Sequence, residues 1–174
     1  MLVFALVLQA TAFLLVAIAA YEDVRHMRIR NDLSVGVAVL FIPYALTLGM
    51  HDALIHIGCA ALVLAITATL FFTKMFGGGD AKMLAALALW LDFGSLPLFA
   101  VTMAMAGGAL ALTALLFKQS QILSRVAPRF PALIGPQDGW FAALARGEAV
   151  VPYGVAIAIA TAVTFPMTAL PVKG

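Results

Sequence analysis

The sequence predicts an all-α integral membrane protein with six transmembrane helices. Of its 174 residues, 64% are apolar and only 10% are charged, whereas soluble domains carry roughly 25% charged residues. The charges cluster between long uncharged runs instead of recurring every few residues, so the apolar surfaces must face lipid or one another. Because the sequence shows no separate soluble domain, we expect residues 1–174 to form a single transmembrane domain.

Six apolar runs supply the predicted helices. A helix rises 1.5 Å per residue, so about 20 residues cross a hydrocarbon core of ~30 Å. The fourth run is short, and it spans the membrane only if Ala81, Lys82 and the turn after the run add length. The predicted spans are residues 2–20, 33–50, 53–73, 83–91, 96–117 and 151–172.

The first run also resembles a cleaved signal peptide in its position. No Lys or Arg precedes it, however, and it is longer than the apolar core of a signal peptide. We therefore interpret residues 2–20 as the first transmembrane helix.

The basic residues predict the orientation in the membrane. Six spans place successive connections on alternate sides, and this arrangement leaves only Lys173 on one side. Cytoplasmic loops carry an excess of Lys and Arg, so the other side is cytoplasmic and both termini face outward. One long cytoplasmic connection, residues 118–150, joins the fifth and sixth helices, and its aromatic residues predict that it lies on the membrane surface. The cytoplasmic basic residues are Arg25, Arg28, Arg30, Lys74, Lys82, Lys118, Arg125, Arg129 and Arg146.

Two aspartates are the candidate catalytic residues. Asp80 follows three glycines, Gly77, Gly78 and Gly79, at the start of an apolar run, and an ionisable group at membrane depth indicates a functional site. Asp23 ends the first apolar run on the same predicted face. Two carboxylates that lie close together hold one proton between them near neutral pH. Such a pair can activate water against a peptide carbonyl.

Three other interpretations of these aspartates stay open. In the first, Asp23 pairs with Arg25 or Arg28, and Asp80 pairs with Lys82, as ordinary ion pairs at helix ends. In the second, the aspartates relay protons in a small proton-coupled transporter or channel subunit. In the third, the chain is a purely structural membrane subunit. A relay would place acids at mid-depth, whereas here they end helices on one face, which favours the peptidase.

Three motifs resemble those of one family. Gly77 to Met83 resembles the GxGD signature of intramembrane aspartic peptidases, and its Ala-Lys-Met ending is similar to that of type IV prepilin peptidases. Asp23-Val24-Arg25 resembles the Asp-x-Arg motif of that family. Ile29-Arg30-Asn31 is similar to the Ile-Pro-Asn that follows it, with Arg30 in place of the usual proline. Pro152-Tyr153-Gly154 resembles the entry into the last helix of the family.

The resemblance implies a multi-pass enzyme of the bacterial inner membrane, with its active site facing the cytoplasm. Such an aspartic endopeptidase removes the short basic leader of prepilin or pseudopilin substrates. Asp23 and Asp80 would be catalytic, the three glycines would form the active-site loop, and Lys82 and Arg25 are candidate supporting residues. Large members of the family also carry a domain with paired CxxC motifs and methylate the new N-terminus. This chain has one cysteine, Cys59, and resembles the short form that serves Flp or tight-adherence pili, so we expect no methylation.

The remaining composition indicates which ligands to expect. We expect no cofactor and no metal, because His51 and His56 lack the carboxylate and third ligand that a metal site needs. No basic stretch carries the interleaved aromatic residues of a nucleic-acid surface, so the expected partners are the prepilin substrate and membrane lipid. The basic residues on the cytoplasmic side would repel a basic leader. The acidic residues that can offset this repulsion are Glu22, Asp32, Asp138 and Glu148.

The predicted topology can be tested with reporter fusions. Reporters fused after Phe117 or Lys118 should be cytoplasmic, whereas reporters at His51 and at the C-terminus should lie outside. A cytoplasmic C-terminus would mean an odd number of spans and would contradict the arrangement that puts both aspartates on one face.

Overall fold

The computed structural model of the chain describes residues 2–74, 76–120, 125 and 135–168. These residues form helices and connections, and the described part contains no strand. The helices are α1 (Leu2–His26), α2 (Asn31–Ala45), α3 (Met50–Phe72), α4 (Gly78–Ala88), α5 (Leu96–Ser120), α8 (Trp140–Ala145) and α9 (Tyr153–Thr168).

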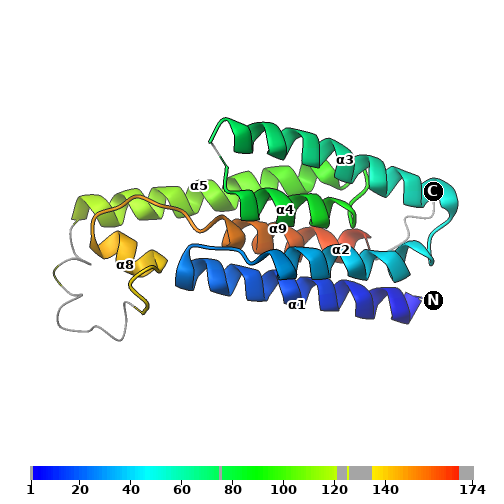
Figure 1. Cartoon of the computed structure of the whole chain (residues 1–174), viewed down its shortest axis with the longest axis horizontal. Helices are drawn as coiled ribbons and strands as arrows, with labels where there is room; N and C mark the ends of the chain where they lie inside the picture. The colour runs from blue at the N-terminus through cyan, green and yellow to red at the C-terminus, as the bar shows by residue number, and fades with distance from the viewer. Residues whose placement is uncertain (1, 75, 121–124, 126–134, 169–174) are drawn as a thin grey trace.

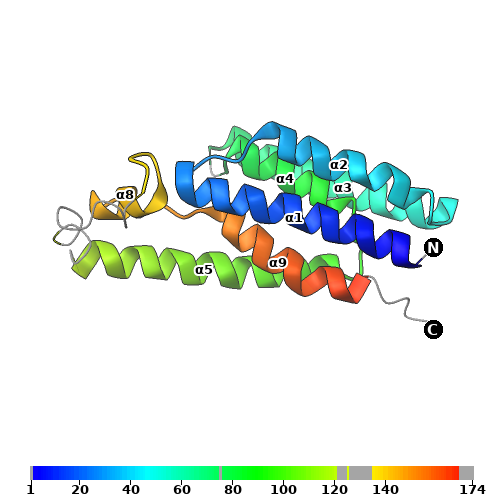
Figure 2. The same cartoon turned by 90° about the horizontal axis from the view of Figure 1, so that it is seen from below.

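The bundle helices lie side by side, and helices that follow one another in the chain run in opposite directions (Figures 1 and 2). Neighbouring helices pack in the order α5, α9, α1, α2, α4 and α3, so α3 and α5 lie at the two outer edges. The short helix α8 packs against α1 and α5 beyond one end of the bundle. We call this the α8 end. There α1, α3 and α5 finish, and α2, α4 and α9 begin.

The all-helical prediction is confirmed, and the structure gives each span a length. Helices α1, α3 and α5 are long and apolar enough to cross a membrane, which makes the chain a multi-pass membrane protein. Helices α2 and α9 are apolar but have 15 and 16 residues. Helix α4 has 11 residues and is therefore roughly 17 Å long. The prediction that the fourth helix is short is confirmed. That this helix spans the membrane remains a prediction.

Several helix boundaries differ from the predicted ones. Helix α1 continues beyond residue 20 to His26, because a helix can carry its charged residues into the interface without losing backbone hydrogen bonds. Helix α3 begins at Met50 instead of residue 53, with Gly49 as its N-cap and Asp52 in the first turn. An acidic side chain is favourable there because of the helix dipole.

The fourth helix begins earlier than the predicted span of residues 83–91, so that it includes two of the three glycines. Gly77 is the N-cap of α4, and Gly78 and Gly79 are already helical. The ring of Phe71 would meet a Cβ on Gly78 at 3.1 Å, and the carbonyl oxygen of Ile29 would meet one on Gly79 at 3.0 Å. Gly78 and Gly79 therefore leave the space in which the end of α3 and the α1–α2 connection pack directly against the start of α4.

A buried tryptophan holds the short helix α4 in the bundle. Trp90 follows α4, is fully buried, and donates a hydrogen bond from Nε1 to the carbonyl oxygen of Val37 at 3.1 Å. Its ring stacks on Tyr44 with centroids 4.9 Å apart. The chain therefore anchors the far end of α4 with an aromatic contact and a buried hydrogen bond, which compensates for its small length.

The long connection between α5 and α9 is described only in part. Helix α8 lies in this segment, and the indole Nε1 of Trp140 donates to the carbonyl oxygen of Val150 at 2.9 Å. Arg129 in this connection and Lys173 near the C-terminus lie outside the described residues.

Candidate active site

Asp23 lies one turn before the end of α1 and is 5% exposed. Its Oδ2 accepts a hydrogen bond from the backbone N–H of Gly154 at 2.8 Å. Because Gly154 is the second residue of α9, this N–H has no partner within its own helix, and the helix dipole favours an anion there. A Cβ at position 154 would lie 2.9 Å from the Cβ of Asp23. Only glycine therefore lets α9 approach Asp23 this closely.

Asp80 lies in the first turn of α4 and is partly buried. Its carboxylate folds back onto the N-cap, where the backbone amide of Gly77 interacts favourably with it. An acidic side chain at this position of a helix can satisfy the free N–H of the N-cap residue. A Cβ on Gly77 would lie 2.5 Å from the Oδ2 of Asp80, so the glycine leaves the space that this carboxylate occupies.

The fold brings the two aspartates together at the α8 end of the bundle. The negative charge of Asp23 acts on the carboxyl group of Asp80, although the two belong to different helices. The rings of Phe76 and Tyr153, with centroids 5.3 Å apart, join the segments that lead into α4 and α9. Each of these rings precedes the glycine whose backbone contacts one aspartate, so the contact holds both glycines near the pair.

A comparison with models of known protein families identifies the family of this chain. The model of the type IV leader peptidase family matches residues 10–112. The chain belongs to this family. No curated protein and no solved structure matches the chain. The resemblance found in the sequence motifs is thus confirmed at the level of the family, and membership makes the chain a peptidase. The matched segment contains Asp23, Asp80 and the three glycines, whereas Gly154 lies beyond it.

The ion pairs of the alternative interpretation do not form among the residues that the structure describes. The Nε of Arg25 donates to the hydroxyl of Tyr21 at 2.9 Å, and its guanidinium lies 5.3 Å from the centroid of the Tyr21 ring. The Nζ of Lys82 donates to the Oδ1 of Asn31 at 3.0 Å. Both aspartates of this leader peptidase are therefore without a cationic partner in the described part of the chain.

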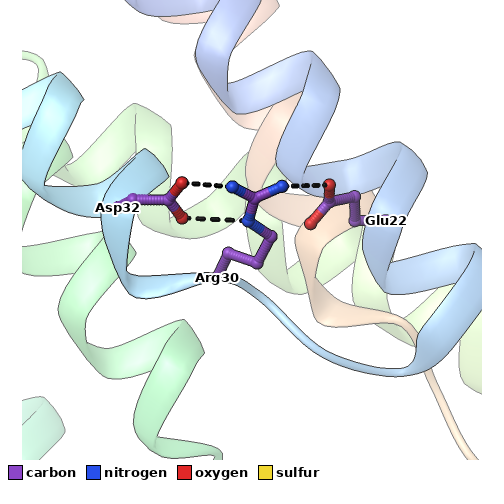
Figure 3. Close-up of polar contacts among 3 residues, drawn as sticks. All are labelled: Glu22, Arg30 and Asp32. Atoms are coloured by element: carbon purple, nitrogen blue, oxygen red, sulfur yellow. Dashed lines mark hydrogen bonds and ion pairs between the residues drawn. The ribbon is translucent and has the colours of Figure 1, made fainter.

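Arg30 joins the end of α1 to the start of α2 (Figure 3). Its guanidinium donates to Oε1 of Glu22 at 3.2 Å and binds both carboxylate oxygens of Asp32, with Nε 3.0 Å from Oδ1. Its backbone φ is −74°, close to the value that a proline imposes. The turn thus keeps the shape that the proline of the resembling motif would give it, and the arginine adds an ion-pair clamp.

The other two acidic residues at this end also have partners. Nδ1 of His26 lies 3.1 Å from Oδ2 of Asp138, and this hydrogen bond holds the pKa of Asp138 below its usual value. Nε of Arg146 donates to Oε1 of Glu148 at 2.7 Å, which likewise lowers the pKa of Glu148. All four acidic residues proposed to offset the basic charge are thus paired with cationic or imidazole groups of this chain.

Two glycines in contact with α1 were not assigned a role from the sequence. Gly154 was recognised only as part of a motif, and its N–H provides the hydrogen bond to Asp23. Gly139 is the N-cap of α8, and a Cβ there would lie 2.6 Å from the carbonyl oxygen of Arg25. Gly154 lies near the predicted start of the sixth span, which is a weak signal for its contact, whereas no helix was predicted near Gly139. The part of the chain that the structure describes contains no group of three or more His, Cys, Asp or Glu side chains placed to hold a metal ion.

The space that Gly77 leaves for Asp80 can be tested by Gly77→Ala. The added methyl group would collide with the far end of a side chain, so the carboxylate of Asp80 should rotate away while the helix stays intact. We expect at least tenfold lower peptidase activity at an unchanged amount of protein in the membrane, measured by cleavage and immunoblotting.

Gly49→Ala is the matched control. Gly49 is also the N-cap of a bundle helix with extended backbone angles, and a Cβ there has no atom within 4 Å. This variant should keep full activity. Equal activity of Gly77→Ala and Gly49→Ala would contradict the placement of Asp80.

Proposed function

We propose that this leader peptidase is an aspartic endopeptidase in which Asp23 and Asp80 form the catalytic pair. The observation that carries the proposal is their environment: two carboxylates from separate helices interact with each other, and each contacts a backbone amide instead of a cation. Two carboxylates in mutual repulsion share one proton. One member is then available as a base while the other is available as an acid, as the hydrolysis of an amide requires.

The first chemical step is the attack of water on the scissile carbonyl. The ionised carboxylate takes a proton from the water molecule as its oxygen bonds to the carbonyl carbon. The protonated carboxyl group gives its proton to the carbonyl oxygen. The product is a neutral tetrahedral diol, and the two aspartates have exchanged their protonation states.

The second step breaks the bond between carbon and nitrogen. The aspartate that took a proton from water now gives it to the departing amine. The other aspartate takes a proton from one hydroxyl group of the diol, and a carboxylic acid forms. The pair ends with one proton, as it began, and no cofactor or metal is required by the proposed cycle.

The proposed substrate is the short basic leader of a prepilin-like protein, cut on the cytoplasmic side of its apolar helix. This extends what the family establishes, and the cluster of basic and acidic residues at the α8 end supports it. We propose six spans with both termini outside, a single domain of residues 1–174 and a location in the bacterial inner membrane. We further propose service to Flp-type pili without methylation.

Arg25 and Lys82 are proposed to support the site without touching the aspartates. Arg25 belongs to the same helix turn as Asp23 but contacts Tyr21, and Lys82 contacts Asn31. Each lies two positions after one of the aspartates in the sequence. The transporter alternative has no observation in its favour, because both aspartates lie at one end of the bundle.

Single substitutions Asp23→Asn and Asp80→Asn test the catalytic pair. Asparagine keeps the size of aspartate and much of its hydrogen bonding but cannot cycle a proton. We expect each variant to insert normally and to lose roughly 10²–10⁴-fold in the rate of prepilin cleavage. The double variant should be no slower than either single variant, because residues that act as a unit lose their effect together.

Asp52→Asn is the matched control for these substitutions. Asp52 also lies in the first turn of a bundle helix, but at the opposite end of the molecule from the pair. The Asp52→Asn variant should cleave prepilin at the wild-type rate. A near wild-type rate for either Asp23→Asn or Asp80→Asn, with comparable protein in the membrane, would remove that aspartate from the mechanism.

Treatment with a chelator tests whether the carboxylates are sufficient. Because the pair supplies both the acid and the base, the purified enzyme should retain its cleavage rate after incubation with EDTA and desalting. Loss of activity that zinc restores would refute the mechanism.

A further inference from the structure

A groove on the outer surface of the bundle lies between α2, α3 and α4. Its volume is about 580 Å³, and its walls are almost entirely apolar. Alanines from all three helices line the groove, among them Ala38, Ala61 and Ala86, and their small side chains leave this space open. Asn31, Ser34 and Lys82 add polar groups at one end only.

The length of the groove corresponds to part of one membrane leaflet. Its lining extends from Asn31 to Ala38 on α2, from Ile57 to Leu64 on α3 and from Lys82 to Leu89 on α4. Each interval covers seven steps of 1.5 Å, or roughly 10 Å along the helix axis. A transmembrane helix that packed along the bundle would contact it over a length of up to ~30 Å. A single acyl chain of one leaflet therefore fits this groove better than a spanning helix does.

The polar groups of the groove lie in the same order as those of a phospholipid, with a charged group at the end of the groove and a hydrogen-bonding group one turn deeper. At the α8 end, Lys82 donates to Asn31, and an ammonium group has two further donors. No carboxylate pairs with Lys82 among the described residues. One turn deeper, roughly 4.5 Å along α2, Ser34 is 4% exposed and its hydroxyl has no hydrogen-bond partner in the described part of the chain. Beyond Ser34 the lining is apolar.

The groove is separate from the catalytic pair. Successive helix residues are 100° apart, so Lys82 and Asp80, two positions apart, lie on nearly opposite faces of α4. The carboxyl group of Asp80 interacts with the negative charge of Asp23, whereas the side chain of Lys82 contacts Asn31 at the start of α2. An occupant of the groove would therefore contact α4 without reaching the scissile bond.

We propose that this groove binds one anionic phospholipid of the leaflet that surrounds the α8 end. Its phosphate would be held by Lys82 and Asn31, an ester carbonyl would accept the hydrogen bond of Ser34, and one acyl chain would lie over the alanines. Basic groups between transmembrane helices near the membrane surface are suited to anionic head groups. The bound lipid would fill the space beside the short helix α4 and satisfy the buried hydroxyl.

The test measures lipid retention by the purified full-length protein. Dioleoyl phosphatidylglycerol or the zwitterionic dioleoyl phosphatidylcholine is titrated into the protein in detergent, and bound lipid is counted by native mass spectrometry. One phosphatidylglycerol should bind more tightly than phosphatidylcholine. Lys82→Gln should weaken phosphatidylglycerol binding roughly fivefold, the share of one basic residue near the surface, whereas Lys82→Arg should restore it. Because the readout is binding, failure here leaves the proposed peptidase activity untouched.

Two further variants test the position of the lipid. Ala61→Leu adds bulk to the lining of the groove and should weaken both lipids, whereas Ala104→Leu, on the exposed surface of α5, should leave binding unchanged. Lys118→Gln, in the last turn of α5, is the matched control for charge. Equal binding of the two lipids, or equal affinity of Lys82→Gln and Lys118→Gln for phosphatidylglycerol, would overturn the proposal even if Ala61→Leu fails to fold. Displacement of the lipid by one equivalent of a prepilin helix would also overturn it.

Discussion

The hydrogen bond from the N–H of Gly154 to Asp23 is the constraint on which the rest of the structure depends. A buried carboxylate without a donor is costly in free energy, and the donor here comes from the start of the last helix. The first and last helices must therefore lie in contact. Small residues make this contact possible, because Ala12, Ala19, Ala156 and Ala160 are almost completely buried in these two helices. In lipid, such close backbone packing takes the place of the hydrophobic driving force.

The second aspartate depends on a different feature, the three glycines that precede it at the start of α4. Gly77 leaves room for the carboxylate of Asp80, and Gly79 lets the carbonyl of Ile29 lie against the start of α4. The α1–α2 connection thus packs on the same turn that carries Asp80. Since α1 carries Asp23, this contact relates the two aspartates without a direct bond between them. The same connection contains Arg30, whose clamp on Glu22 and Asp32 joins α1 to α2 (Figure 3).

The charge distribution at the α8 end has a consequence for any basic substrate segment. Glu22, Asp32, Asp138 and Glu148 are each paired with Arg30, His26 or Arg146. A cation of the substrate would have to replace one of these partners, so the net electrostatic gain would be small at an exposed site. The apolar part of a prepilin substrate must then supply most of the affinity. This explains how a face rich in Lys and Arg could accept the basic leader of the proposed substrate.

Local sequence determined much of this protein. The apolar runs gave the bundle helices to within a few residues at most ends, and the charge clusters fall at or near the ends of these helices. The glycines before Asp80 and the acid at the end of the first run identified the candidate pair, because charges at membrane depth are rare. These features depend only on neighbours in the chain. The family match then confirmed what the motifs resemble.

Only the tertiary structure decided which side chains meet. The side chain of Arg25 contacts Tyr21 instead of Asp23. The side chain of Lys82 contacts Asn31 instead of Asp80. The donor for Asp23 is the backbone N–H of Gly154. The helices are apolar on nearly every face, so their sequences contain little periodicity to show which face points inward. The rotation of each helix about its axis follows from small-residue packing and a few buried hydrogen bonds between distant segments. Those contacts exist only once the helices have assembled.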